Sequence, residues 1–179
     1  AGSRRSEICE DLRNMVALAK RFPRYQFVVT AVRWIDRALY DEYLRGSDVK
    51  YLCDCTQQTL AMAEAAVVTS GTATLETALM RIPEVVLYRV PKLYEVLRPY
   101  VLKIPYISLV NINLGREAVR EIVCASFDVE ATAAHLQAVL EGGAERQRML
   151  ADFDELSRMM GGEGASERFA RDMVNSLRV

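Results

Sequence analysis

The chain has 179 residues, of which 51% are hydrophobic and 26% are charged, and this composition is ordinary for one soluble globular domain. The formal net charge of −1 lacks the basic excess of nucleic-acid-binding proteins, so we expect no nucleic-acid partner. No apolar run approaches the roughly 20 residues of a membrane-spanning helix, and no signal peptide opens the chain. We therefore expect a cytoplasmic protein.

Apolar periodicity and turn residues predict strands and helices in alternation along the chain. The first helix is expected to be capped by Ser6 and ended by Pro23. Strands are predicted at 25–30, 49–53, 65–68 and 84–88, and helices at 35–44, 56–64, 72–81 and 92–102. A further strand is expected at 106–110, a polar loop at 111–115, a helix opened by Arg116, and helices at 129–140, 144–160 and 165–177.

This alternation is typical of an α/β fold, with a Rossmann-like parallel sheet, right-handed crossovers and helices on both faces. We expect a single domain over residues 1–179 that ends in a helical tail at 144–179. No strand precedes the Gly2-Ser3-Arg4 turn, so the sequence is expected to be a piece of a longer polypeptide that supplies at least one more strand.

The main candidate site is the stretch from Val67 to Glu76, where a buried strand runs through a Ser70-Gly71-Thr72 turn into a helix. The first N–H groups of such a helix have no intrahelical partner and coincide with the positive end of its dipole, so they attract anions. We expect a diphosphate there, with Glu76 one turn further on and within reach of a ribose hydroxyl. The alternative is a plain strand-turn-helix junction, because a single glycine is less specific than a G-x-G-x-x-G motif.

Two further polar turns are expected on the same rim of the sheet. Ligands of open α/β sheets bind at the carboxyl ends of the strands, near the topological switch point. The predicted elements put Gly2-Ser3-Arg4, Ser70-Gly71-Thr72 and the loop at Asn111 at strand carboxyl ends. Three polar turns on one rim favour a binding site over three unrelated loops.

Three motifs in this order are familiar: Gly2-Ser3-Arg4-Arg5-Ser6-Glu7-Ile8, then Ser70-Gly71-Thr72-Ala73-Thr74-Leu75-Glu76, then Tyr106-Ile107-Ser108-Leu109 with Asn111 and Gly115-Arg116-Glu117. Together they resemble lipid-A-disaccharide synthase, over nearly the whole chain but only the carboxyl half of that enzyme. The resemblance implies a GT-B glycosyltransferase, in which two Rossmann-like domains enclose the active site and the carboxyl-terminal domain holds the nucleotide. The family transfers 2,3-diacylglucosamine from its UDP-activated form to lipid X, 2,3-diacylglucosamine 1-phosphate, giving the lipid A disaccharide and UDP.

The resemblance assigns catalytic roles to Arg4 and Asn111, with Arg4 as the cation that stabilises the diphosphate as the sugar bond breaks. It implies a UDP-binding set of Gly2, Ser3, Arg4, Ser70, Gly71, Thr72, Ala73, Thr74 and Glu76, and a sugar rim of Asn111, Arg116 and Glu117. The residues alone leave plainer interpretations open: a solvated arginine at position 4, a surface glutamate at position 76, and loop capping around Asn111.

The amino-terminal domain of the family has no counterpart in this sequence, and the acceptor site and the expected general base, a carboxylate, belong to that domain. Val110 stands where several relatives carry proline, a departure in the loop leading to Asn111. We expect a domain that folds, binds UDP weakly and has no turnover alone. Its expected partners are UDP-2,3-diacylglucosamine, lipid X, its own amino-terminal domain, a second copy of the chain and, in the whole enzyme, the inner face of the bacterial inner membrane.

No metal or other cofactor is expected. The four cysteines favour reduced structural thiols over a metal site or a disulfide. The single histidine, His135, is expected to be a packed or surface residue. The helix at 92–102 has the spacing of an ordinary packed helix or, alternatively, of one that lies on a membrane and takes up acyl chains. In the last helix, an apolar face for the other domain or a second copy is expected at Phe169, Met173 and Leu177.

Two other functions remain open from the sequence. A UDP-N-acetylglucosamine 2-epimerase-like enzyme shares the two-domain architecture, but its chemistry usually needs a histidine near the sugar, and His135 lies on the wrong element. The other is a nucleotide-binding or interaction module without catalysis. A comparison of UDP binding with ADP binding separates this module from the transferase.

Overall fold

The computed structural model describes residues 1–90, 105–161, 170–171 and 173–175. The helix expected at 92–102 lies outside the described residues, as do Phe169 and Leu177 of the expected last helix. Within the described ranges the elements follow in the order α1 (Arg5–Ala19), β1 (Val28–Ala31), α2 (Arg37–Leu44), β2 (Lys50–Cys53), α3 (Thr56–Leu60), β3 (Ala66–Thr69), α4 (Thr72–Leu79), β4 (Glu84–Arg89), α6 (Leu109–Leu114), β5 (Arg120–Cys124), α7 (Val129–Val139) and α8 (Arg146–Met160).

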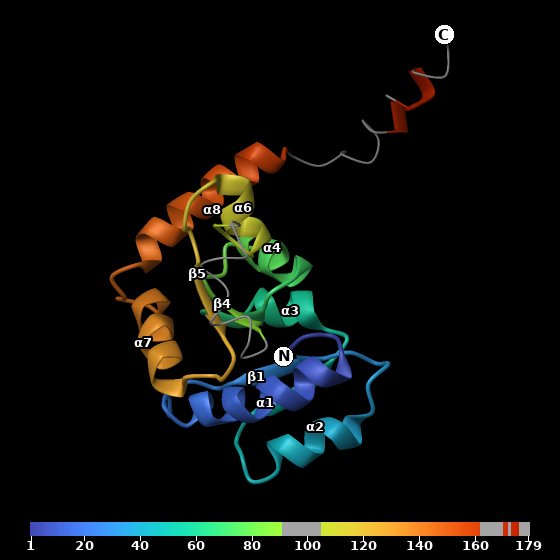
Figure 1. The fold of residues 1–179 in the computed structure, drawn as a ribbon, viewed down its shortest axis with the longest axis vertical. Helices are drawn as coiled ribbons and strands as arrows, with labels where there is room; N and C mark the ends of the chain where they lie inside the picture. The colour runs from blue at the N-terminus through green and yellow to red at the C-terminus, as the bar shows by residue number, and fades with distance from the viewer. Residues whose placement is uncertain (91–104, 162–169, 172, 176–179) are drawn as a thin grey trace.

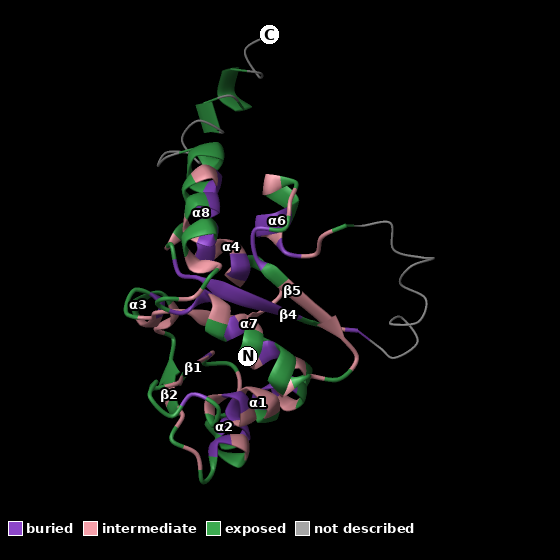
Figure 2. Cartoon of the chain, turned by 90° about the vertical axis from the view of Figure 1, so that its left-hand side faces the viewer, coloured by how far each residue is buried: buried purple, intermediate pink, exposed green. Residues whose placement is uncertain are grey.

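The strands are all parallel and form two sheets in the described part of the chain. One sheet pairs β1 with β2, and the other has the order β3-β4-β5. Figure 1 shows α1 against β1 with α2 beyond it, and Figure 2 shows α4, α6 and α8 on one face of the larger sheet and α7 on the other. The predicted α/β class with parallel strands and helices on both faces is confirmed, with the strands divided between two sheets.

Each sheet has its own hydrophobic core, because each buries its strands against different helices. The smaller core joins α1, β1 and α2 through Ile8, Leu12, Val29, Leu39 and Tyr40. The larger core joins β4 to α4, α6, α7 and α8. Its fully buried members include Ala78, Val85, Val86, Val110, Val119, Met149, Phe153 and Leu156. After buried Glu84, β4 has an apolar run of three buried residues, Val85, Val86 and Leu87, as expected for a strand covered on both faces.

The region after residue 105 differs from the sequence prediction. The expected strand at 106–110 and loop at 111–115 are wrong, because α6 occupies Leu109–Leu114. The hydroxyl of Ser108 accepts from the Asn111 N–H at 3.2 Å and starts the helix, and Gly115 ends it with a φ of 67°. The helix expected from Arg116 is also wrong, since the chain turns there and enters β5. A short apolar run does not by itself distinguish a strand from a buried helix.

Among the described residues, no helix combines the length and the apolarity that crossing a bilayer requires.

Candidate functional site

The turn between β3 and α4 leaves a helix start without a side-chain cap. Ser70 donates its N–H to the Leu87 carbonyl at 2.8 Å, which ties the turn to β4, and Gly71 is the N-cap of α4. Buried Thr74 donates its hydroxyl to the Gly71 carbonyl at 2.9 Å, so this hydroxyl shapes the turn and is not directed at a ligand. The uncapped N–H groups and the helix dipole together make the start of α4 a favourable place for an anion.

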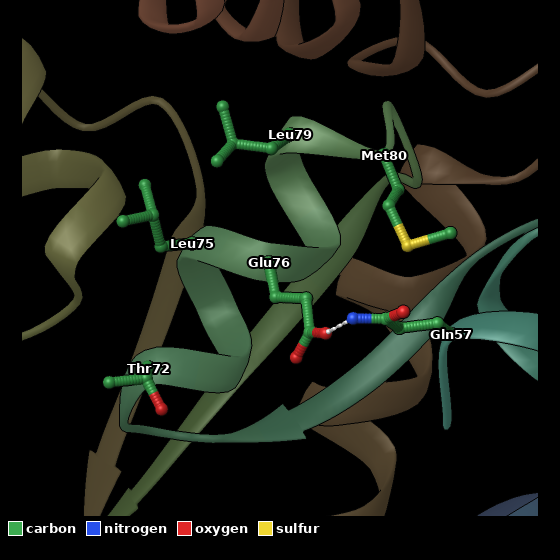
Figure 3. Close-up of a pocket in the computed structure, with 6 residues that line it drawn as sticks. All are labelled: Gln57, Thr72, Leu75, Glu76, Leu79 and Met80. Atoms are coloured by element: carbon green, nitrogen blue, oxygen red, sulfur yellow. Dashed lines mark hydrogen bonds between the residues drawn. The ribbon is translucent and has the colours of Figure 1, made fainter. Parts of the chain in front are cut away.

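Glu76 lies one turn into α4, on the wall of a shallow surface hollow of about 550 Å³. Figure 3 shows its carboxylate turned toward Gln57 of α3, and the Gln57 side-chain amide donates to Oε1 at 2.7 Å. Thr72 lines the same hollow at the start of the helix. The second carboxylate oxygen, Oε2, accepts no hydrogen bond from the described residues. Glu76 is therefore held in place through one oxygen, while the other remains able to accept a hydrogen bond.

The turn before α1 differs from the α4 start, because the carboxylate of Glu7 at position N3 reaches back and caps it. Arg4 is the N-cap of α1, so the expectation that Ser6 caps this helix is wrong. The Glu7 Oε2 accepts from the N–H groups of Ser3 at 3.0 Å and Arg4 at 3.2 Å, while Oε1 accepts from Arg4 Nη1 at 3.0 Å. The side chain of Arg4 is 80% exposed. These backbone donors thus point at a position where negative charge is stabilised.

Gly2 allows this close approach. Its φ of 80° lies in the left-handed region, and a Cβ added there would stand 2.3 Å from Glu7 Oε2. Any other residue would strain the backbone and push the carboxylate away from the turn. The glycine is therefore required where the chain enters α1.

The two turns converge on one cavity of about 950 Å³. Gly2, Ser3 and Arg4 line it together with Ser70, Gly71, Thr72, Ala73 and Glu76. Ser70 follows the carboxyl end of β3, and the Ser3 carbonyl accepts from the indole N–H of Trp34, which follows the carboxyl end of β1, at 3.0 Å. The structure therefore brings these two predicted turns to one edge.

Two loops at this edge were missed by sequence reasoning. Trp34 is 66% exposed although it is the single tryptophan of the chain, and a large aromatic residue just after a predicted strand was the available signal. Arg33 beside it donates from Nε to Asp54 Oδ2 at 2.6 Å and from its N–H to Oδ1 at 3.3 Å. Asp54 has a φ of 53° and follows β2, so this pair joins the ends of the two strands of the smaller sheet.

Asn111 lies elsewhere, and its predicted place at a strand carboxyl end is wrong. It is fully buried in α6, where Oδ1 accepts from the N–H groups of Ala118 and Val119 at 2.8 and 2.9 Å. Nδ2 donates to the Val119 carbonyl at 2.8 Å and to Glu121 at 2.9 Å. Val119 immediately precedes β5, whose first residue pairs with the start of β4. The amide therefore holds the amino edge of the sheet, opposite the Ser70 turn.

Arg116 and Glu117, predicted for the sugar rim, are not among the residues that line this cavity, and both pair with other side chains of the chain. Arg116 Nη2 donates to Asp152 at 2.7 Å and Glu155 at 2.6 Å, both on α8. These hydrogen bonds, first from Glu155 and then from Asp152, raise the pKa of the Arg116 guanidinium, and the same contact lowers the pKa of the Glu155 carboxyl. Glu117 pairs with Arg120 at 3.0 Å. The cluster fastens α8 to the turn after α6.

Arg89, at the carboxyl end of β4, connects the two halves of the site. Its Nε donates to Asp11 at 3.1 Å and its Nη2 to the Glu10 carbonyl at 3.0 Å, both on α1. Burial raises the pKa of the Asp11 carboxyl, and the hydrogen bond and charge of Arg89 oppose that shift. Since α1 carries Arg4 and β4 holds the Ser70 turn, this pair fixes the distance between the two turns.

His135 lies half-buried on α7, outside the set of residues that line the cavity. In the described part of the chain we find no group of three or more histidine, cysteine, aspartate or glutamate residues arranged to hold a metal ion.

Comparison with known proteins gives the family. The model of the lipid-A-disaccharide synthetase family matches residues 1–168. This chain belongs to the lipid-A-disaccharide synthase family. Among the relatives named lipid-A-disaccharide synthase, that of Anaeromyxobacter dehalogenans (strain 2CP-1 / ATCC BAA-258) is 34% identical over 99% of this chain and 48% of its own length. That of Myxococcus xanthus (strain DK1622) is 35% identical over 98% of this chain and 48% of its own length.

A third relative of the same name, from Sodalis glossinidius (strain morsitans), is 35% identical over 87% of this chain and 43% of its own length. The chain thus spans about half the length of the curated relatives that it matches. The family resemblance predicted from the three motifs is confirmed for lipid-A-disaccharide synthase.

Proposed function

We propose that this chain is the nucleotide-holding domain of a lipid-A-disaccharide synthase and binds UDP-2,3-diacylglucosamine through its UDP part. In the whole enzyme, the diacylglucosamine unit is transferred to lipid X, giving the lipid A disaccharide and UDP. The observation that carries this proposal is the convergence of two helix starts, an exposed arginine and Glu76 on one cavity.

The diphosphate is assigned to the space between the two turns. Backbone N–H groups of Ser3, Gly71 and Thr72 donate to its oxygens, with the hydroxyls of Ser70 and Thr72 beside them. Such donors keep their orientation whether or not the ligand is bound, so they stabilise charge without reorganisation. The phosphate oxygens replace the Glu7 carboxylate at the first turn, because a doubly charged group competes well for the same N–H donors.

Arg4 acts during bond cleavage. As the bond between the anomeric carbon and the diphosphate oxygen breaks, negative charge grows on that oxygen. The exposed guanidinium turns from Glu7 toward this charge and stabilises it, which lowers the barrier because the interaction is stronger in the transition state than in the bound donor. The cation and two helix starts supply the positive charge that the leaving UDP needs, so the proposal includes no metal.

Glu76 recognises the ribose. Its free Oε2 accepts from the ribose hydroxyls, while Gln57 holds the other oxygen in place. A carboxylate fixed in this way discriminates against ligands that lack those hydroxyls, because such a ligand would leave Oε2 without a hydrogen-bond donor.

The acceptor side is assigned to the enzyme's own amino-terminal domain. That domain contributes the lipid X site and the carboxylate that deprotonates the attacking hydroxyl, so the present chain alone is proposed to lack turnover. The substrates carry acyl chains, which puts the whole enzyme at the inner face of the bacterial inner membrane. A second copy of the chain is a further proposed partner.

Isothermal titration with UDP tests the nucleotide site, with ADP as the competing base. Arg4→Ala and Glu76→Ala should each weaken UDP binding by about tenfold, equal to about 1.4 kcal/mol. The matched control is Arg148→Ala, which removes an exposed arginine of α8 that pairs with Glu145. Unchanged affinity in both site variants would place the site elsewhere, and failure to bind UDP or ADP at millimolar concentration would favour an interaction module.

A further inference from the structure

The carboxylate of Glu7 occupies the hydrogen-bond donors of the first turn. Its Oε2 accepts from the N–H groups of Ser3 at 3.0 Å and Arg4 at 3.2 Å, and its Oε1 accepts from Arg4 Nη1 at 3.0 Å. Glu7 also lines the cavity that the two turns share. One carboxylate of the chain thus takes up two backbone donors and a guanidinium, the kinds of group that bind a phosphate.

The place that Glu7 fills at this turn accommodates one anion. A Cβ added at Gly2 would stand 2.3 Å from Glu7 Oε2 and 2.8 Å from Glu7 Cβ, so the backbone of the turn lies directly against this side chain. The side chain of Glu7 is only 26% exposed. A second anion on the same two N–H donors would also be repelled by the carboxylate. A phosphate therefore binds at this turn only after Glu7 has left it.

The start of α4 differs in this respect, although it lines the same cavity. Gly71 is its N-cap and provides no side-chain cap, and the Glu76 carboxylate is directed at Gln57 on α3. One helix start is thus open to a ligand anion, while the other is filled by an anion of the chain itself.

We propose that Glu7 is an internal competitor of the diphosphate, which holds the first turn closed in the free domain and swings out when the diphosphate binds. Its role rests on the proposed function, because the place it fills is the one assigned there to phosphate oxygens. The apparent affinity of a site is lowered by the fraction of molecules that are competent to bind. A capping side chain of ordinary strength is in place about 80–90% of the time, so Glu7 weakens binding by about five- to tenfold.

The same movement controls Arg4. While Glu7 is in place, the Arg4 guanidinium donates to its carboxylate, and this ion pair keeps the cation at the turn. A diphosphate that displaces Glu7 takes over both the backbone donors and the cation. The competitor therefore moderates the affinity for the nucleoside diphosphate, which the reaction has to release.

A plainer role for Glu7 is that of a helix cap alone. Its position N3 and its bond to the N-cap backbone are those of a capping box, which stabilises α1 whether or not a ligand binds. Glu7→Gln separates the two roles, because glutamine also serves at this position of a capping box but carries no charge. A neutral amide is the weaker competitor for charged and backbone donors, so the variant should bind anions more tightly while α1 stays capped.

Titration calorimetry with UDP and with inorganic pyrophosphate tests the proposal on the parent chain and its variants. Glu7→Gln should bind both ligands about fivefold more tightly, with little change in melting temperature. Glu7→Asp keeps the charge on a side chain one methylene shorter and should bind about threefold more tightly, which also covers the case in which Glu7→Gln fails to fold. The control Glu42→Gln removes the same charge from an exposed position of α2 outside the cavity, and its affinity should change by less than about twofold.

The two ligands keep this proposal separable from the nucleotide assignment. If the parent chain binds UDP and Glu7→Gln binds it equally or more weakly, the competitor is wrong and the nucleotide site stands. A gain from Glu42→Gln as large as that from Glu7→Gln, or no gain from Glu7→Asp, would show a long-range effect of charge and would also overturn the competitor. Binding of pyrophosphate but not UDP, tighter in Glu7→Gln, would support the competitor and refute the nucleotide site. Failure of every chain to bind either ligand would refute both.

Discussion

Similar polar residues lie at the carboxyl and amino edges of the larger sheet, but their hydrogen-bond partners differ. At the carboxyl edge, Arg4 and Glu76 are each held by a single neighbour and keep unused hydrogen-bonding capacity. At the amino edge, both polar residues form their hydrogen bonds within the protein. Asn111 accepts from the backbone before β5, and Arg116 donates to carboxylates of α8. The extremes of exposure follow this division, since the side chain of Arg4 is 80% exposed and Asn111 is fully buried, whereas Glu76 and Arg116 are both half-buried.

This difference separates binding from architecture. A polar side chain whose partners are all intramolecular stabilises the fold and is costly to remove. A polar side chain with spare donors or acceptors at the rim costs little to remove but changes what the protein binds. Mutations at the amino edge should therefore alter stability, and mutations at the carboxyl edge should alter UDP affinity.

The largest expected effect is at the amino edge. Asn111→Ala leaves the N–H groups of Ala118 and Val119 and the Val119 carbonyl buried without partners, so the free energy of unfolding should fall by about 4 kcal/mol. Urea denaturation measures the loss. Asn113→Ala is the control, because its exposed side chain makes one bond to the Leu109 carbonyl and should cost about 0.5 kcal/mol or less. A loss at Asn111 as small as that at Asn113 would mean that the amide does not hold this edge.

Glu84 also lies at the amino edge but, unlike Asn111 and Arg116, its carboxylate has no hydrogen-bond partner among the described residues. It is fully buried at the start of β4, neither carboxylate oxygen has a hydrogen-bond partner in the structure, and burial raises its pKa well above 4.5. Glu84→Gln removes the charge and should stabilise the protein by about 2 kcal/mol at neutral pH. Thermal and urea unfolding measure this gain, and a loss of stability would show that the carboxylate has a partner in solution.

The same carboxyl predicts a pH dependence with a definite sign. Below pH 4.5 the group is protonated in both the folded and the unfolded chain, so it costs nothing. As the pH rises above 4.5 the unfolded chain loses the proton first, and stability falls until the pH passes the raised folded-state value. Glu84→Gln should flatten this part of the stability curve. Glu117→Gln, an exposed control, should leave the slope as in the parent chain.

Sequence reasoning was most successful where local signals and tertiary structure agreed. The Ser70-Gly71-Thr72 turn lies where the sequence predicted, because an apolar β-branched run, small residues and a helix with Thr72 at its start all indicate the same junction. The α/β class followed from repeated junctions of this kind.

It failed around Asn111 because the same apolar run can form either a strand or a buried helix turn. The Ser108 cap and the hydrogen bonds of the Asn111 side chain with residues seven and eight positions later decide the outcome. Such side-chain hydrogen bonds produce no periodic pattern in the sequence. The division into two sheets was missed for a related reason, since strand pairing depends on which neighbours are present and not on the pattern of each strand.

The next largest expected effect is at the carboxyl edge and concerns the affinity for UDP. Arg4→Ala should weaken UDP binding by about tenfold and change the free energy of unfolding by about 0.5 kcal/mol or less, because its ion pair with Glu7 is exposed. Arg116→Ala should do the reverse, lowering stability by about 1 kcal/mol with UDP affinity unchanged. For both variants, titration calorimetry with UDP measures the affinity, and urea denaturation measures the free energy of unfolding. If Arg116→Ala also weakened UDP binding, the functional separation of the two edges would be wrong.

The smallest expected effect concerns how the carboxyl edge is held. Trp34 donates its indole N–H to the Ser3 carbonyl at 3.0 Å, and Trp34→Phe keeps an aromatic ring but removes this donor. Since Ser3 and Arg4 present their N–H groups from the same turn, a looser turn should weaken UDP binding by about threefold, or about 0.7 kcal/mol. Titration calorimetry of both chains measures the ratio. Because Trp34 is 66% exposed, stability should change by less than about 0.5 kcal/mol. A loss of affinity larger than that of Arg4→Ala would instead indicate that the exposed ring contacts the ligand directly, and unchanged affinity would show that Glu7 alone holds the turn.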